Sequence, residues 1–151
     1  MRISQRCEYA LRALLELAKR SGEGPVRIQD IARQQSIPKK FLANLLVQLR
    51  RGQFVESKKG PQGGYYLAMP PRQIRLGEVV RFLDGPIAPI RCVSRALGER
   101  CEIGDRCGYF PVWKRVRDAV AEIVDGTTIA DVVEDQERRE AANAKALMYH
   151  I

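Results

Sequence analysis

Apolar and polar positions in the first third of the chain follow the period of α-helices. An apolar stripe at three- and four-residue steps predicts a first helix from about Ser4 to Arg20, with Ser4 as its N-cap. Glycines and a proline then break the pattern, a short extended piece follows at Val26, and a second helix is expected from about Gln29. Pro38 opens a third helix after a tight turn. Two helices joined by so short a turn predict a helix-turn-helix.

The period changes after the third helix. Short β-strands are predicted at Phe54 to Ser57 and at Tyr65 to Ala68, and the connecting residues KKGPQGG are basic and rich in glycine. Glycine lets the backbone of such a turn come close to a neighbouring surface, and Lys58 and Lys59 add positive charge. Directly after a helix-turn-helix, such a hairpin is typical of a wing that lies along nucleic-acid phosphates.

Two more helices and a loop are predicted in the second half. Apolar spacing favours a helix from Leu76 to Leu83, which ends at the sequence DGP. A loop then extends to about Gly108, and a longer amphipathic helix is expected from Pro111 to about Val124. The apolar stripe of this longer helix suits pairing with a second copy of the chain, although packing on its own domain is equally compatible with the pattern.

The end of the chain is more polar. Thr127 or Thr128 is expected to cap a last short helix through Val133, and the residues from Glu134 form a polar tail. The predicted fold class is therefore mainly α with a small β-hairpin wing. Three parts are predicted. Residues 1–75 form a winged helix-turn-helix unit, and residues 136–151 form the tail. Residues 76–135 contain a linker helix, a cysteine loop (85–108) and a dimerisation helix.

The positive charge of the chain lies in its N-terminal half. Residues 1–75 hold 15 Lys and Arg against 5 Asp and Glu, or 15 − 5 = +10, and the remaining residues hold 11 against 13, or −2. The cations are spread over several short elements, whereas a membrane-surface helix would concentrate them opposite a broad apolar face. This favours a polyanion that is bound by a folded surface over a membrane, and the predicted helix-turn-helix makes double-stranded DNA the expected partner. No apolar stretch resembles a signal peptide or a membrane span, so a cytoplasmic location is expected.

The third helix has a polar face opposite its leucines. Lys39, Lys40 and Asn44 fall on or near this face, where they would reach the edges and phosphates of a DNA major groove. An ordinary helix pair with a solvated basic end is the simpler alternative, and the basic hairpin that follows argues against it.

Three of the four cysteines lie in the predicted loop. Cys92, Cys101 and Cys107 are separated by eight and five residues, since 101 − 92 − 1 = 8 and 107 − 101 − 1 = 5. Clustered thiols in a reducing compartment indicate metal or redox chemistry before disulfides, and the close cysteine pairs of structural zinc sites are absent. Thiolates are soft ligands for iron-sulfur clusters. By themselves these residues leave a metal site and reactive or incidental cysteines equally open.

Several segments of the chain, in order over residues 1 to about 135, carry a resemblance to a known family. They are MRIS-x-x-x-x-YA-x-RALLELA, IQDIARQQSIPKKFLANLLVQLRRGQFVES, KGPQGGYYLA, IRLGEVVRFLDG and VWKRV-x-DAV through TTIADVV. With these segments the sequence resembles the Rrf2 family of bacterial regulators, and in particular its iron-sulfur members. The resemblance implies a homodimer formed through the long helix near the C-terminus and a two-fold operator. It also implies DNA contacts from Lys39, Lys40 and Asn44 on the third helix and from Lys59, Gln62 and Gly63 in the wing. The positive charge of the wing tip adds Lys58 to these expected contacts.

The resemblance also changes the interpretation of the cysteines. Cluster-binding members place three cysteines in this loop, and clusterless members lack them, so Cys92, Cys101 and Cys107 are expected to bind an iron-sulfur cluster of two or four irons. Some relatives have a histidine three residues after the last cysteine, where this chain has Phe110. In other relatives a carboxylate of the partner's first helix is the fourth ligand, and Glu8 stands at that position.

Other interpretations remain open at this stage. Cys7 is a rival fourth ligand, although its place in the apolar stripe favours a small core residue, and Glu8 could simply pair with Arg12 four residues later. The leading hypothesis is a transcription regulator, a repressor or activator and not an enzyme, that senses cluster status, iron, nitric oxide or redox stress. A clusterless thiol- or partner-sensing regulator is the second, and an electron-transfer protein the third, because it would leave the basic wing unexplained.

Overall fold

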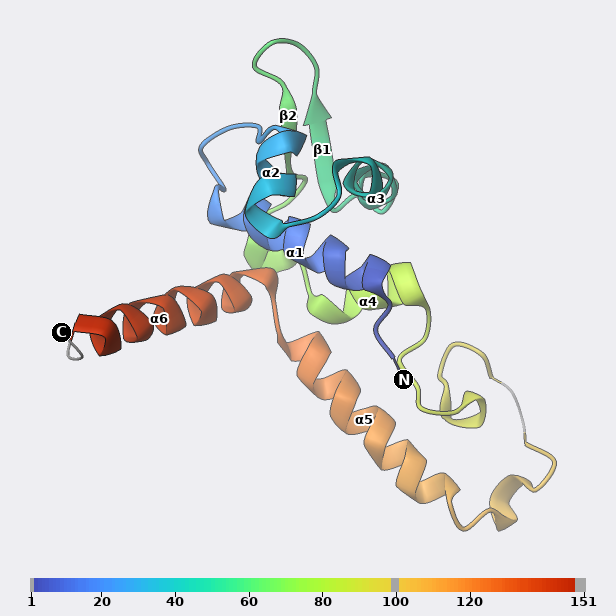
Figure 1. Cartoon of the computed structure of the whole chain (residues 1–151). Helices are drawn as coiled ribbons and strands as arrows, with labels where there is room; N and C mark the ends of the chain where they lie inside the picture. The colour runs from blue at the N-terminus through green and yellow to red at the C-terminus, as the bar shows by residue number, and fades with distance from the viewer. Residues whose placement is uncertain (1, 99–100, 149–151) are drawn as a thin grey trace.

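The computed structural model describes residues 2–98 and 101–148. Its elements are, in order, α1 (Gln5–Lys19), α2 (Ile28–Gln35), α3 (Lys39–Arg51), β1 (Val55–Lys58), β2 (Gly64–Leu67), η1 (Pro71–Gln73), α4 (Leu76–Asp84), η2 (Arg91–Val93), η3 (Gly104–Arg106), α5 (Phe110–Gly126) and α6 (Ile129–Met148), where η marks a short 3-10 helix. Figure 1 shows a body formed by α1 to α4 and the hairpin, from which α5 and α6 extend in different directions. This is the mainly helical fold with a β-hairpin that the sequence predicts. None of the described helices is long and apolar enough to cross a membrane.

The core is built around α1. Its N-cap is Ser4, as predicted, because the Ser4 side chain accepts a hydrogen bond from the Cys7 backbone N–H at 3.1 Å. The buried face of α1 packs with α2, the leucine stripe of α3, the strand β2, and buried residues of α4 and of the start of α6. Each fully buried leucine removes enough apolar surface from water to contribute about 1.5–3 kcal/mol. The largest fully buried side chains include Leu14, Leu42, Leu45, Leu46 and Leu49.

The turn between α2 and α3 is tight and is clamped to α1. Ser36 adopts the left-handed conformation (φ 51°), and the buried Ile37 donates its backbone N–H to the Ala32 carbonyl at 2.9 Å. Gln35 is held on both sides, because its side chain donates to Glu16 at 3.0 Å and its carbonyl accepts a hydrogen bond from Arg12. These contacts fix the angle between α2 and α3.

The hairpin is antiparallel, with Val55 opposite Leu67 and Lys58 opposite Gly64. A third segment joins its base, because Val26 and Tyr65 exchange two backbone hydrogen bonds of 2.8 Å. A lone two-stranded hairpin is marginal in water, so this bridge anchors the wing to the body.

The last helix begins as predicted but is much longer than expected. Thr128 caps it, since its side chain accepts from the Asp131 N–H at 3.2 Å and Asp131 accepts from the Thr128 N–H at 2.8 Å. The expected end at Val133 is wrong, because α6 continues to Met148. Residues 134–148 contain no glycine or proline and are rich in alanine, glutamate and arginine, which have high helix propensity. The segment lacks an apolar stripe, so periodicity could not reveal it.

Candidate nucleic-acid interface and cysteine loop

Helix α3 has one buried and one exposed face. Leu42, Leu45, Leu46 and Leu49 are buried in the core. Lys39, Lys40 and Asn44, which the sequence predicts as DNA contacts, are exposed. The two lysines lie at the helix start, and Asn44 is one turn after Lys40 on the same face. The helix therefore presents a polar, positively charged edge to solvent.

The wing tip carries the other predicted contacts. Lys58, Lys59 and Gln62 are exposed, whereas Gly63 is half-buried. A Cβ on Gly63 would lie 2.3 Å from the Lys58 carbonyl oxygen and 2.8 Å from the Gly60 carbonyl oxygen. Such distances are far below van der Waals contact, so glycine is required here to close the tip, whether or not its backbone also meets DNA.

Two arginines beside the wing were missed by the sequence reasoning. Arg27 donates a hydrogen bond to the Pro61 carbonyl at 2.9 Å, and Arg50 donates to the Ser57 hydroxyl at 3.0 Å. They come from the start of α2 and the end of α3 and meet the wing from two sides. Their place in the basic half of the chain was the one signal for them in the sequence. Arg27 precedes α2, and Arg50 does not lie on the predicted polar face of α3.

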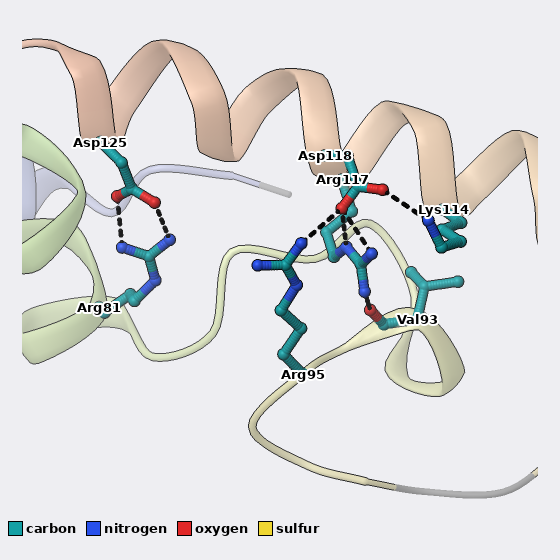
Figure 2. A network of polar contacts seen from close by, with 7 residues as sticks. All are labelled: Arg81, Val93, Arg95, Lys114, Arg117, Asp118 and Asp125. Atoms are coloured by element: carbon teal, nitrogen blue, oxygen red, sulfur yellow. Dashed lines mark hydrogen bonds and ion pairs between the residues drawn. The ribbon is translucent and has the colours of Figure 1, made fainter.

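A network of ion pairs ties α5 to the body and to the loop before it (Figure 2). Arg81 of α4 and Asp125 of α5 form a two-pronged pair with distances of 2.6 and 2.8 Å. Asp118 accepts hydrogen bonds from Lys114 at 3.0 Å and from Arg95 at 3.1 Å. The bonds from Lys114 and from Arg117 lower the pKa of Asp118 to about 2.

The same network fixes the first part of the cysteine loop. Arg117 donates to the Val93 carbonyl at 2.7 Å, directly after Cys92 in the chain (Figure 2). The short helix η2, which contains Cys92, therefore sits against α5. Arg95 pairs with Asp118, so a carboxylate matches its charge.

The three loop cysteines are free thiols and none of them is buried. Cys101 is exposed, and Cys92 and Cys107 are half-buried. Within residues 2–98 and 101–148, no group of three His, Cys, Asp or Glu side chains is placed so that it could hold a metal ion. The chain thus brings the three cysteines onto one loop without assembling them into a finished ligand set. The histidine His150 lies outside the described residues.

The two rival ligands on α1 lie in opposite environments. Cys7 is fully buried, and burial, with the nearby Asp84 carboxylate, raises the pKa of its thiol to about 11. Glu8 is exposed and lies 3.7 Å from Arg12, the pairing that the simpler interpretation predicts. Glu8 also borders an apolar pocket of about 290 Å³ formed by residues of α1, α4 and α6.

Comparison with known proteins decides the family. Residues 3–135 match the family model described as Rrf2, iron-dependent transcriptional regulator. The chain belongs to the Rrf2 family. A relative named IscR from Sodalis glossinidius (strain morsitans) is 34% identical over 91% of this chain and 81% of its own length. The solved structure of CymR, the global cysteine regulator of B. subtilis, matches with a TM-score of 0.77 at 35% identity, over 89% of this chain and 97% of that one. The structure of T. potens IscR matches with a TM-score of 0.74 at 32% identity, over 92% and 90%.

These relatives establish the general function. This Rrf2 chain is a DNA-binding transcriptional regulator and not an enzyme, as the sequence predicts. The winged fold is likewise confirmed by the matching structures. The signal is a separate question, since relatives named IscR and CymR are about equally similar to the chain.

Proposed function

We propose that this chain is a homodimeric regulator whose affinity for a two-fold DNA operator follows the state of an iron-sulfur cluster. The observation that carries the proposal is the placement of three free, accessible cysteines on one loop between α4, which packs in the DNA-binding body, and α5, which leaves it. A change in the conformation of that loop can alter the position of α5 relative to the DNA-binding body. A regulator needs such a link, because a signal acts only by favouring one DNA-binding state over another.

The exposure of α5 supports the dimer. None of its residues is buried, and large apolar side chains of this helix face solvent, with Val112 52%, Val116 40% and Ile123 67% exposed. These three residues recur at steps of four and seven and therefore share one face. An exposed apolar stripe on a helix outside the body suits burial against the same helix of a second copy. Such a symmetric contact is typical of a two-fold dimer. The two recognition helices would then meet operator half-sites related by the same axis.

The donor set suits an iron-sulfur cluster in its chemistry. Cys92, Cys101 and Cys107 would be the thiolate ligands, since all three are free and none is buried. A bound cluster would supply a centre that oxidants, nitric oxide or iron shortage can alter. The protein would contribute the thiolate ligands, and Arg117 holds the segment directly after Cys92 on α5.

Burial favours Glu8 over Cys7 as the fourth ligand. A ligating thiol must lose its proton, and the Cys7 thiol is enclosed by the core of its own subunit. Glu8 is exposed, and it stands on the surface of α1 where a partner's loop can approach it. Ligation across the dimer would make cluster binding and subunit pairing depend on each other.

Arg12 connects Glu8 to the helix-turn-helix by direct contacts. It pairs with Glu8, stacks over the Tyr9 ring at 5.5 Å and donates to the Gln35 carbonyl beside the helix-turn-helix turn. Tyr9 in turn packs in a T-shaped arrangement with Phe41 on α3, with ring centroids 5.6 Å apart. If the Glu8 carboxylate ligates a cluster, its ion pair with Arg12 is lost. The position of the Arg12 side chain, and of the turn before α3 to which it donates a hydrogen bond, would then change.

The deciding experiment is anaerobic purification followed by iron and acid-labile sulfide analysis and Mössbauer spectroscopy. We expect one cluster per subunit, and loss of it in Cys92→Ala, Cys101→Ala and Cys107→Ala alike. Cys7→Ala is the matched control and should retain the cluster, whereas Glu8→Ala should keep a cluster with altered spectra. Stoichiometric zinc without sulfide would contradict the proposal, and a normal Glu8→Ala spectrum beside an altered Cys7→Ala spectrum would reverse the ligand assignment.

The same samples test the second candidate, a clusterless thiol regulator. It is favoured by the exposed Cys101 thiol and by the absence of an assembled metal group among the described residues. If it is correct, anaerobic protein contains no iron, and oxidation of Cys101 alone changes operator binding.

A further inference from the structure

An open groove of about 560 Å³ lies between the start of α2, the end of α3 and the wing. Four cations line it, namely Arg27, Arg50, Lys58 and Lys59. The remaining lining residues are neutral, so no carboxylate contributes to its wall. Like charges gathered around one space repel one another, and an anion placed between them relieves that repulsion.

Five of the ten arginines in residues 1–75 pair with a carboxylate of the described residues, whereas the two arginines of this groove do not. Arg6, Arg12, Arg20, Arg33 and Arg72 each lie within 4.0 Å of a carboxylate. Among the ion pairs of the described residues, none involves Arg27 or Arg50. Their hydrogen bonds go to neutral oxygens of the wing, so the positive charge of the groove is not cancelled from within the chain.

Those hydrogen bonds also orient the guanidinium groups. A guanidinium carries five N–H donors in a planar fork that matches the geometry of phosphate oxygens, and the bond to the wing uses one of them. Arg27 is held by Pro61 from one side and Arg50 by Ser57 from the other. The backbone beside them is shaped by close approach, since a Cβ on Gly64 would lie 2.4 Å from the Val26 carbonyl oxygen.

We propose that this groove clamps a phosphate of the DNA backbone, with Arg27 and Arg50 as direct contacts in addition to the lysines of the wing. The inference rests on the proposed placement of α3 and the wing on DNA and extends it to a site between them. The space lies between α3 and the wing, so a DNA strand that contacts both would run beside Arg27 and Arg50. The contact is to phosphate, so it strengthens binding to every sequence and specifies none.

The test is the salt dependence of DNA binding by the full-length chain. Wild type, Arg27→Gln, Arg50→Gln and the double variant are titrated by fluorescence anisotropy onto a labelled duplex of mixed sequence and onto an operator selected from a random pool. Removing one phosphate-binding arginine should reduce the slope of log affinity against log salt by about 0.9, so the double variant should show a reduction of about 1.8. The reduction should be equal on the two duplexes.

Two further variants separate phosphate binding from other effects. Arg33→Gln removes an exposed arginine of α2 that already pairs with Asp30 and should leave the slope near that of wild type. Ser57→Ala removes the partner of Arg50 without removing charge. If Ser57→Ala reproduces the reduction seen in Arg50→Gln, Arg50 only holds the wing and its assignment as a phosphate ligand is wrong. Thermal unfolding of every variant checks that the protein is folded when its salt slope is measured.

The outcomes distinguish this inference from the function on which it rests. A wild-type slope in the double variant, with wild type itself binding DNA, overturns the groove alone. A wild-type protein that binds neither duplex overturns the operator proposal together with the groove.

Discussion

Replacement of Gly63 by alanine tests whether the wing acts in DNA binding. The new Cβ would lie 2.3 Å from the Lys58 carbonyl oxygen, about 1 Å inside the ordinary contact distance, and would also meet the Gly60 carbonyl at 2.8 Å. Forcing a methyl group into such a space costs about 1–3 kcal/mol. A two-stranded hairpin yields locally, so the tip should shift and global stability should fall by only about 1 kcal/mol.

The shift would displace Lys58 and Lys59 from the positions that they hold beside the groove. We therefore expect about a tenfold loss of operator affinity, about 1.4 kcal/mol, and a salt slope reduced by one to two. The assay is anisotropy titration at several salt concentrations, with chemical denaturation to follow stability. Gly126→Ala is the matched control, because a Cβ there meets nothing within 4 Å. If the two alanine variants bind DNA alike, the closed tip is not needed and the reasoning about the wing is refuted.

Three other predictions concern the dimer, the core and the buried thiol. Val116→Asp should give a folded monomer in sedimentation velocity, since it puts a charge on the exposed face of α5, and an intact dimer would exclude this face from the interface. Leu46→Ala should lower the free energy of unfolding by about 2–5 kcal/mol in denaturant titration, because Leu46 is 0% exposed, and a decrease below about 1 kcal/mol would argue against the packing shown. Iodoacetamide should modify Cys101 in native protein and leave Cys7 unmodified by mass spectrometry until the chain is unfolded, whereas equal rates would show that Cys7 is not enclosed.

Local patterns predicted most elements of the fold. The stripe from Cys7 to Leu17 and the leucines of α3 repeat at helical spacing because each side chain has to reach the same core. The proline and glycine signals placed the turns for the same local reason, since these residues restrict or free the backbone wherever they stand. The failure at α6 is equally physical, because helix propensity without an apolar face leaves no periodic signal in residues 134–148.

The candidate site was predicted only in part. The exposed residues Lys40, Asn44 and Lys59 could be selected because the leucines of α3 and the glycines of the wing fix what remains for solvent. Arg27 and Arg50 could not, since they lie 23 residues apart and meet only when the hairpin folds between them, as their bonds to Pro61 and Ser57 show.

The sequence by itself determined the helix-turn-helix, the wing, the charge distribution and the three cysteines of one loop, because each depends on residues close together in the chain. Only the tertiary structure decided that Cys7 is sealed in the core while its neighbour Glu8 is exposed, that Arg12 joins α1 to the turn before α3, and that Arg117 holds the start of the cysteine loop on α5. These facts depend on which elements pack together, and a difference of one position on a helix turns a side chain by about 100°, from core to solvent.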